Sequence, residues 1–272
     1  MSILLKKVFG RENNIIIGAV HLPPLLGYPK FPGLKIATQN ALADLNALEK
    51  GGAHGIIFEN NYDLPHATFA APGTVASMAL VGQELRKATS LPLGINVLWN
   101  DYPAALALAK LLNLQFIRVP VFVDDVKTQY CIIKSSPKEI IAMRTKLAAN
   151  NVALLTDIQV KHSIKLQKRS LDASARLAIK AGADALIVTG KWTGNAPEQE
   201  LLQELKNEIP SFPILIGSGV NEKNITPLFH FANGAIVSTS LKKGGIRADE
   251  INVKAYSQRI DQNKVKKLLA QI

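Results

Sequence analysis

The chain has 272 residues, 47% of them hydrophobic and 19% charged, a balance that supports a large buried core and argues against long disordered regions. Its formal net charge of +11, from 32 basic and 21 acidic side chains, suits phosphorylated small molecules, nucleic acid or an anionic membrane surface as partners. The single cysteine, Cys131, excludes an internal disulfide and fits a reducing compartment, so we expect a cytoplasmic protein.

The charge and hydropathy patterns narrow these partner classes. Eight basic residues fall in 242–272 at helical spacings around an apolar stripe, which is typical of a solvated helix face, and no nucleic-acid motif accompanies them. We therefore expect no nucleic-acid partner. The first fourteen residues do not fit a signal peptide, and no apolar run reaches the ~20 residues of a membrane span. We expect no transmembrane segment, while contact with a membrane surface stays open.

Short β-rich segments alternate with helical patterns along the chain. In order, the predicted strands span 14–20, 55–60, 91–99, 114–123, 152–160, 185–190, 212–219 and 234–240. The predicted helices span 37–53, 73–89, 103–113, 138–151, 171–183, 197–208, 225–233 and 252–270. Strands that alternate with helices imply parallel strands joined by right-handed crossovers. Eight such units predict an α/β fold, the closed (β/α)8 TIM barrel.

The alternative architecture is an open doubly wound sheet, but no GxGxxG motif follows the first strand. No Gly/Ser/Pro-rich linker interrupts the alternation, so we assign one barrel domain to residues 15–272. Segment 1–14 is predicted to cap the barrel bottom or to lie on its surface. The stretch 121–137 is long for a loop and is interpreted as a lid, or as a surface that a second subunit covers. We expect a homo-oligomer.

Polar residues recur where the predicted strands end, and this end of a TIM barrel carries the active site. Glu59 and Asp157 are candidates for general acid and base. His21 and Lys161 are further catalytic candidates, Lys161 as a Schiff-base amine if it is desolvated. Structural alternatives stay open: His21 as a strand cap, Glu59 as an ion-pair partner of Arg118, and Lys161 as a simple anion-binding group.

Further residues at the same end are candidate substrate ligands. They are Asn96, Asn100, Asp101, Arg118, His162 and Lys191. Asp157, Gln159 and Lys161 share one parity, so a straight strand would point all three the same way. If that direction is inward they form a polar column; outward they would face the helices, which is unfavourable for charges, so we favour inward for Asp157. Two histidines and two carboxylates also offer metal ligands: His21, His162, Glu59 and Asp157. Their spacing is not diagnostic of a metal site. A metal is therefore possible but not indicated, and we assign neither a metal nor a cofactor.

Two corners of small residues follow the last two predicted strands. They comprise Gly217, Ser218 and Gly219 after the seventh strand and Thr239 and Ser240 after the eighth. Loops at these positions form the recurrent phosphate site of TIM barrels, because glycines let main-chain N–H groups converge on an anion and a helix N-terminus adds positive charge. We therefore predict a phosphate cup, with Lys191 and Lys242 adding charge, and a phosphorylated small molecule as ligand.

Eight stretches of the sequence also match a known family. They are GAVHLPPLLGYP (18–29), GIIFENNYDLP (55–65), LPLGINVLWND (91–101), FIRVPVF (116–122), TDIQVKHS (156–163), GADALIVTGKWTG (182–194), LIGSGVNEKNI (215–225) and GAIVSTSLKKGG (234–245). Over nearly its whole length the chain resembles the BtpA/SgcQ family, a group of ribulose-phosphate-binding-type barrels. The resemblance implies the barrel fold and a phosphate-bearing ligand.

The resemblance implies two kinds of function. One branch of the family is described as a nucleosidase linked to sugar uptake, and the cyanobacterial branch is linked to stabilising photosystem I at the thylakoid surface. We expect an enzyme acting on a phosphorylated sugar or nucleoside-like substrate, by hydrolysis, isomerisation or carbon–carbon chemistry. The alternative is a non-catalytic assembly factor for a membrane protein complex. Tyr62 and the segment 162–169 depart from the family pattern, so the substrate preference is not carried over.

Overall fold

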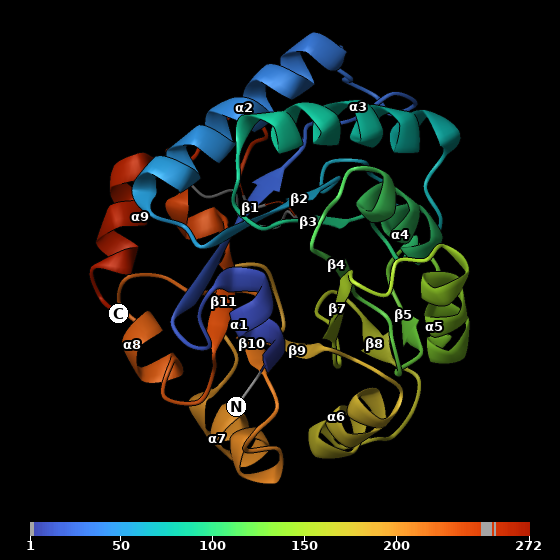
Figure 1. The fold of residues 1–272 in the computed structure, drawn as a ribbon, viewed down its shortest axis with the longest axis vertical. Coiled ribbons are helices and arrows are strands. Elements are labelled where there is room, and N and C mark those ends of the chain that lie inside the picture. Colours follow the sequence, from blue (N-terminus) through green and yellow to red (C-terminus); the bar gives the residue numbers. More distant parts are fainter. Residues whose placement is uncertain (1–2, 246–251, 253) are drawn as a thin grey trace.

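The computed structural model describes residues 3–245, 252 and 254–272. Eight parallel strands follow one another around a ring, and the last pairs with the first to close a barrel (Figure 1). The barrel strands are β1 (Ile15–His21), β2 (Gly55–Glu59), β3 (Leu93–Asn96), β4 (Phe116–Val119), β7 (Ala153–Asp157), β9 (Ala185–Val188), β10 (Ile214–Ile216) and β11 (Gly234–Val237). The predicted TIM barrel is confirmed.

One helix follows each barrel strand, and together they surround the barrel (Figure 1). They are α2 (Leu34–Gly51), α3 (Pro72–Ala88), α4 (Tyr102–Leu111), α5 (Pro137–Lys146), α6 (Leu171–Lys180), α7 (Gln199–Glu208), α8 (Ile225–Leu228) and α9 (Gln262–Leu269). Gly52 ends α2 with φ 99°, a left-handed conformation that glycine adopts without strain. Of the helices in the described residues, none is both long and apolar enough to cross a membrane.

The last two helices are shorter than the sequence pattern indicates. The helix predicted at 225–233 ends at Leu228, and the one predicted from residue 252, part of which lies outside the described residues, begins at Gln262. Asp44 of α2 explains the late start, because its carboxylate accepts hydrogen bonds from the Arg259 guanidinium and the Ile260 N–H, both at 2.8 Å. These bonds hold the chain in an irregular path before α9.

The N-terminal helix α1 (Ile3–Phe9) packs against one end of the barrel interior (Figure 1). Its Leu5 and Phe9 are buried among inward-facing strand residues, and the Phe9 ring lies 5.4 Å from the ring of Phe116. Phe116 and Gly55, which Phe9 also approaches, are the first residues of their strands. Helix α1 therefore covers the N-terminal ends of the strands.

A small antiparallel sheet, absent from the sequence prediction, joins the loops after β4 and β7. Strand β5 (Val126–Lys127) pairs with β6 (Ile132–Ile133) on one side and β8 (Ile164–Lys165) on the other. Val126 and Ile133 are buried against Trp99 and Val121 beneath the sheet. The stretch 121–137 is therefore a folded hairpin, and it is tied to a second loop by main-chain pairing.

Candidate active site

One ring of positions closes the barrel interior at the C-terminal ends of the strands. Each position lies two residues after an inward-facing residue of its strand, so the pleat turns it toward the same interior. In strand order these positions are His21, Glu59, Asn96, Arg118, Asp157, Thr189, Gly217 and Ser238. We call this set the polar ring. Apart from Gly217, every member brings a polar side chain to the end of the barrel that carries active sites.

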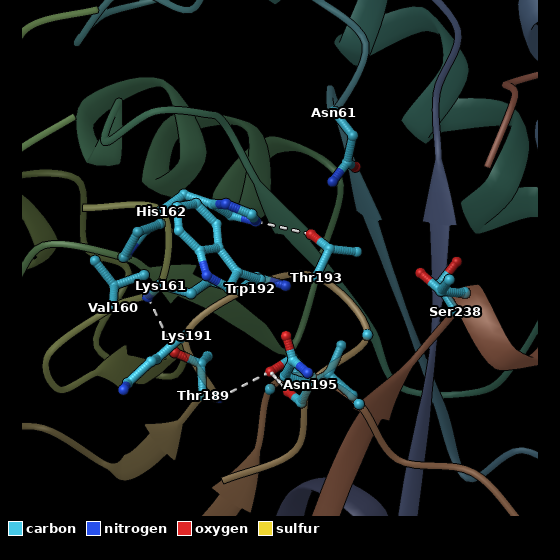
Figure 2. A pocket seen from close by; sticks show the side chains of 18 of the residues that line it. Asn61, Val160, Lys161, His162, Thr189, Lys191, Trp192, Thr193, Asn195 and Ser238 are labelled. Atoms are coloured by element: carbon cyan, nitrogen blue, oxygen red, sulfur yellow. Dashed lines mark hydrogen bonds between the residues drawn. The ribbon is translucent and has the colours of Figure 1, made fainter. Parts of the chain in front are cut away.

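A cavity of about 1670 Å³ opens on the polar ring, and the loops after the strands form its walls. All members of the ring except Asp157 line it. Figure 2 shows Asn61 and Ser238 on one side of this space and Lys161, His162, Trp192 and Thr193 on the other. The cavity therefore brings together residues from loops that lie far apart in the sequence.

Arg118 holds two carboxylates of the polar ring. Its Nε and Nη2 atoms each donate to Asp157 at 2.8 Å, and Nη1 donates to Glu59 at 3.3 Å. Glu59 also accepts a hydrogen bond from the Asn96 amide at 3.2 Å. Burial acts to lower the pKa of the Arg118 guanidinium, but the charges of Asp157 and Glu59 outweigh burial and raise it. Arg118 is therefore a permanent cation at the cavity floor.

The two carboxylates differ in access to the cavity. Glu59 lines it, whereas Asp157 is buried behind Arg118 and does not. Burial raises the pKa of the Asp157 carboxyl, and Arg118 opposes that rise. The geometry does not support the expected proton transfer by Asp157, because the carboxylate is bonded through both oxygens to Arg118 and faces no space for substrate. Its observed contacts position Arg118 instead.

His21 and Lys161 both line the cavity near Glu59. The His21 Nε2 lies 3.9 Å from a Glu59 oxygen. Burial first, and then the charges of Lys242, Lys161 and Arg118, lower the pKa of His21 well below its usual value, so its imidazole is neutral at pH 7. Burial and the charge of Arg118 lower the pKa of Lys161 to about 8.

The predicted polar column along the strand of Asp157 does not form. Gln159 has φ 52°, so the chain leaves the extended conformation after β7. The Gln159 amide donates to the Arg169 carbonyl at 3.1 Å. Lys161 returns to the cavity, where its main-chain N–H donates to Thr189 Oγ1 at 3.0 Å. Asp157 lies inside the barrel, as its parity predicts, but the strand does not continue straight beyond it.

Two predicted substrate ligands, Asn100 and Asp101, do not line the cavity. The Asn100 side chain exchanges two hydrogen bonds, both 2.9 Å, with the main chain of Val121. Asp101 caps α4 by accepting from Ala104 N–H at 3.0 Å and also accepts from Ala70 N–H at 2.9 Å. Loop main chain occupies both side chains, so their expected binding of substrate hydroxyls has no support.

Two other predicted ligands, His162 and Lys191, do line the cavity. The His162 Nε2 lies 2.7 Å from Thr193 Oγ1, and its ring lies 5.5 Å from that of Trp192. Burial, with the charges of Lys161 and Arg118, lowers the pKa of His162 to about 4. A neutral His162 therefore connects the β7 loop to the loop after β9, whereas Lys191 has an exposed side chain.

The five residues of the predicted phosphate cup all line the cavity. Ser218 Oγ accepts from Gly190 N–H at 3.0 Å and donates to the Asn195 carbonyl at 2.8 Å. Within the described residues, the main-chain N–H groups of Gly219 and Thr239 donate no hydrogen bond. In the described chain no α-helix begins at the cup: α8 has four residues and begins only at Ile225, and a single 3-10 turn, Thr239–Leu241, follows β11. Any anion in the cup would therefore be held by loop N–H groups.

Lys242 differs from its predicted role. It is completely buried and does not line the cavity, and no described group accepts a hydrogen bond from its amine, which lies 5.6 Å from the Tyr62 ring. Burial lowers its pKa to about 8. Lys254 is also buried, and its amine donates to the carbonyls of Lys242, Lys243 and Gly244. The expected solvated face is therefore wrong for Lys242 and Lys254.

Buried polar atoms without a partner gather at the cavity. Among the described residues, ten buried side-chain atoms lack a hydrogen bond, and five of them belong to cavity-lining residues. These five are Asn61 Oδ1, His66 Nδ1, Asn96 Oδ1, His162 Nδ1 and Ser238 Oγ. Buried polar groups are normally paired, so this concentration indicates groups arranged for a polar ligand. The four residues considered for a metal form no ligand cluster in the described part of the chain.

Sequence reasoning missed Thr189 and Ser238 as members of the polar ring. Neither residue was singled out, although each follows an inward isoleucine, Ile187 or Ile236, by two residues. Strand parity was the available signal, because every second position faces the barrel interior. The exposed Trp192 on the β9 loop has no comparable periodic signal.

Comparison with known proteins places this chain in a family. The model of the BtpA family matches residues 12–271. The chain belongs to the BtpA family. A relative in that family, the photosystem I biogenesis protein BtpA of Synechocystis, is 36% identical over 252 residues, 90% of this chain and 88% of that protein. SgcQ of Escherichia coli is 29% identical over 262 residues, 95% of this chain and 97% of that protein.

Solved structures place the BtpA-family chain among TIM barrels. The (S)-3-O-geranylgeranylglyceryl phosphate synthase of Thermoplasma acidophilum, solved with its substrate sn-glycerol-1-phosphate, superposes with a TM-score of 0.60 and 12% identity. The match covers 100% of this chain and 98% of that one. At this identity the likeness shows the fold alone, and it agrees with the closed barrel described above.

Proposed function

We propose that this protein is an enzyme acting on a phosphorylated sugar or nucleoside-like small molecule. The phosphate would occupy the cup of Gly217–Gly219 and Thr239–Ser240, and the reacting part would lie over Glu59, His21 and Lys161. The observation that carries the proposal is the shared cavity: it is lined by unpaired polar atoms, ionisable groups and both corners of small residues.

Among the reactions considered, the geometry favours isomerisation or carbon–carbon chemistry over glycoside hydrolysis. Glycosidases commonly use two carboxyl groups that flank the scissile bond, separated by the space a substrate or water needs. Here Arg118 binds both carboxylates, and Asp157 does not face the cavity. Glu59 is the carboxylate with access, and a neutral His21 beside it offers a second proton-transfer group.

A thermal-shift series tests the proposal. Phosphorylated sugars and nucleosides are compared with their unphosphorylated counterparts, and at one hundred times Kd a ligand of the cup should add about 2.7 kcal/mol of stability. For a chain of this size that is a rise in melting temperature of about 5–10 °C. If no phosphorylated compound raises the melting temperature, or the unphosphorylated counterparts act equally, the proposal fails.

Two variants localise the effect. Thr239→Asp adds negative charge to the cup, and Gly219→Asp does the same where a side chain would also meet the main chain of Ala196. Both should abolish the response to phosphorylated compounds. Gly10→Asp is the matched control, because Gly10 has φ 71° and Gly219 has φ 73°. Gly10 has open space for a side chain and follows α1 at the other end of the barrel. It should respond like the wild type.

A second candidate function rests on one relative, which is named a photosystem I biogenesis protein. By analogy, this chain would stabilise a membrane protein complex and would not need its cavity chemistry. Glu59→Gln discriminates the two functions, because an enzyme using Glu59 for proton transfer loses turnover while it still binds phosphorylated ligand. An assembly factor would keep full activity with Glu59→Gln, measured as the amount of complex recovered from membranes.

A further inference from the structure

We propose that Lys161 forms a covalent imine with the carbonyl group of a phosphorylated substrate, which rests on the proposed function and narrows the substrate to a phosphorylated aldehyde or ketone. This class includes the open-chain forms of sugar phosphates. The imine depends on the amine of Lys161 and its surroundings, whereas the phosphate of the proposed substrate would be held by the cup after β10 and β11.

The first support is the position of the amine. Lys161 lines the cavity, and only part of its side chain is open to solvent. Its main chain is held by the 3.0 Å hydrogen bond to Thr189 of the polar ring. No hydrogen bond of the Lys161 amine to a described residue is present, unlike those of Lys254 and Lys264, which bind main-chain carbonyls. The amine is therefore available to a ligand.

The second support is the charge around that amine. The charged or titratable groups whose interaction with it is resolved are Arg118, Glu59, Asp157, His21 and His162. Burial first, and then the permanent cation of Arg118, lower the pKa of Lys161 to about 8, while the charges of Glu59 and Asp157 oppose this change. A lysine that loses its charge this readily suits nucleophilic chemistry better than fixed anion binding.

The reaction balances without a further reactant. The lone pair of neutral Nζ attacks the carbonyl carbon and forms a C–N bond, and a proton passes from nitrogen to oxygen to give a carbinolamine. Protonation of its hydroxyl lets the C–O bond break with loss of water, leaving a protonated imine. Glu59 and neutral His21 face the same cavity and are suited to move these protons.

Borohydride trapping tests the inference. The protein is incubated with dihydroxyacetone phosphate, ribose 5-phosphate or unphosphorylated glycolaldehyde, and sodium borohydride then reduces the imine to a stable secondary amine. Peptide mass spectrometry should place the adduct on Lys161. With a pKa of about 8 this lysine carries on the order of a hundredfold more neutral amine at pH 7 than a free lysine, so we expect labelling at least about tenfold above surface lysines. Labelling should rise with pH through about 8.

Variants and probes separate the two proposals. Lys161→Arg keeps the positive charge and should lose the adduct, while its melting temperature should still rise with the phosphorylated probes. Lys146→Arg changes an exposed lysine on α5 and is the control; it should keep the adduct on Lys161. If phosphorylated probes stabilise the protein but no adduct forms on Lys161, the imine is refuted and the cup stands. If glycolaldehyde labels Lys161 selectively and no phosphorylated compound stabilises the protein, the reactivity of the Lys161 amine is supported and the phosphate cup is refuted.

Discussion

At the scale of single residues, Arg118 ties the site to the stability of the barrel. It is almost fully buried, and its guanidinium contacts carboxylates from β2 and β7. A buried charge without a partner is costly, whereas a paired one with satisfied hydrogen bonds is tolerated. The same contacts that keep Arg118 charged therefore also make its substitution destabilising.

Arg118→Met should destabilise the protein by about 3–5 kcal/mol, because Asp157 stays buried without its partner. Urea unfolding followed by circular dichroism measures this change. Adding Asp157→Asn to Arg118→Met should recover part of the loss, since the orphaned charge is then removed. A double variant no more stable than Arg118→Met would contradict this account.

Lys242→Met should stabilise the protein by about 1–3 kcal/mol at pH 7, because it removes a buried amine without a hydrogen-bond acceptor among the described residues. The folded-state pKa of Lys242 is about 8, against 10.5 for an unperturbed lysine. Between about pH 8 and pH 10.5 the unfolded wild-type chain binds more protons than the folded one, so the stability of the wild type rises with pH. The stability difference between Lys242→Met and the wild type should therefore become smaller as the pH rises. Melting temperatures of the variant and the wild type at pH 7 and 10 check the stabilisation and its pH dependence. A difference in melting temperature that grows with pH would refute this account.

At the scale of elements, the small sheet of β5, β6 and β8 couples two loops of the cavity wall. Val126→Asp places a charge among the buried residues beneath this sheet, so both loops should open to protease together. Limited proteolysis should then cut within both 121–137 and 160–169. Lys127→Asp is the control, because this neighbour in β5 is exposed. Cleavage confined to one loop would show that the loops open separately.

The barrel elements were predictable because apolar strand runs end in polar residues and alternate with helices. The small sheet was not, since its strands have two residues each and carry no periodic signal. The start of α9 depends on Asp44, far away in the sequence, which no local pattern reveals. Within the site, the positions of the polar ring follow from strand parity. The hydrogen bonds of the Asn100 and Asp101 side chains to main chain could not be predicted from the sequence, because they depend on how the loops fold.

At the scale of the whole molecule, α1 contributes to the core although it precedes the barrel. Phe9→Ala should cost about 3–5 kcal/mol, because its ring packs against Phe116 and inward-facing strand residues. Chemical denaturation gives the value, and Lys6→Ala, an exposed change in the same helix, should stay within about 0.5 kcal/mol. Equal effects of the two changes would mean that α1 is not part of the cooperative core.

The expected homo-oligomer stays a prediction.

The covered N-terminal end of the barrel also restricts how ligands move. With α1 packed over the strand starts, the cavity in the described chain opens through the loops at the opposite end. For the enzyme proposed above, entry and exit would share this route, and a product would have to leave before the next substrate could reach the polar ring. A compact ligand presenting one end group suits such a dead-end chamber, whereas a polymer that must thread past the reacting groups does not.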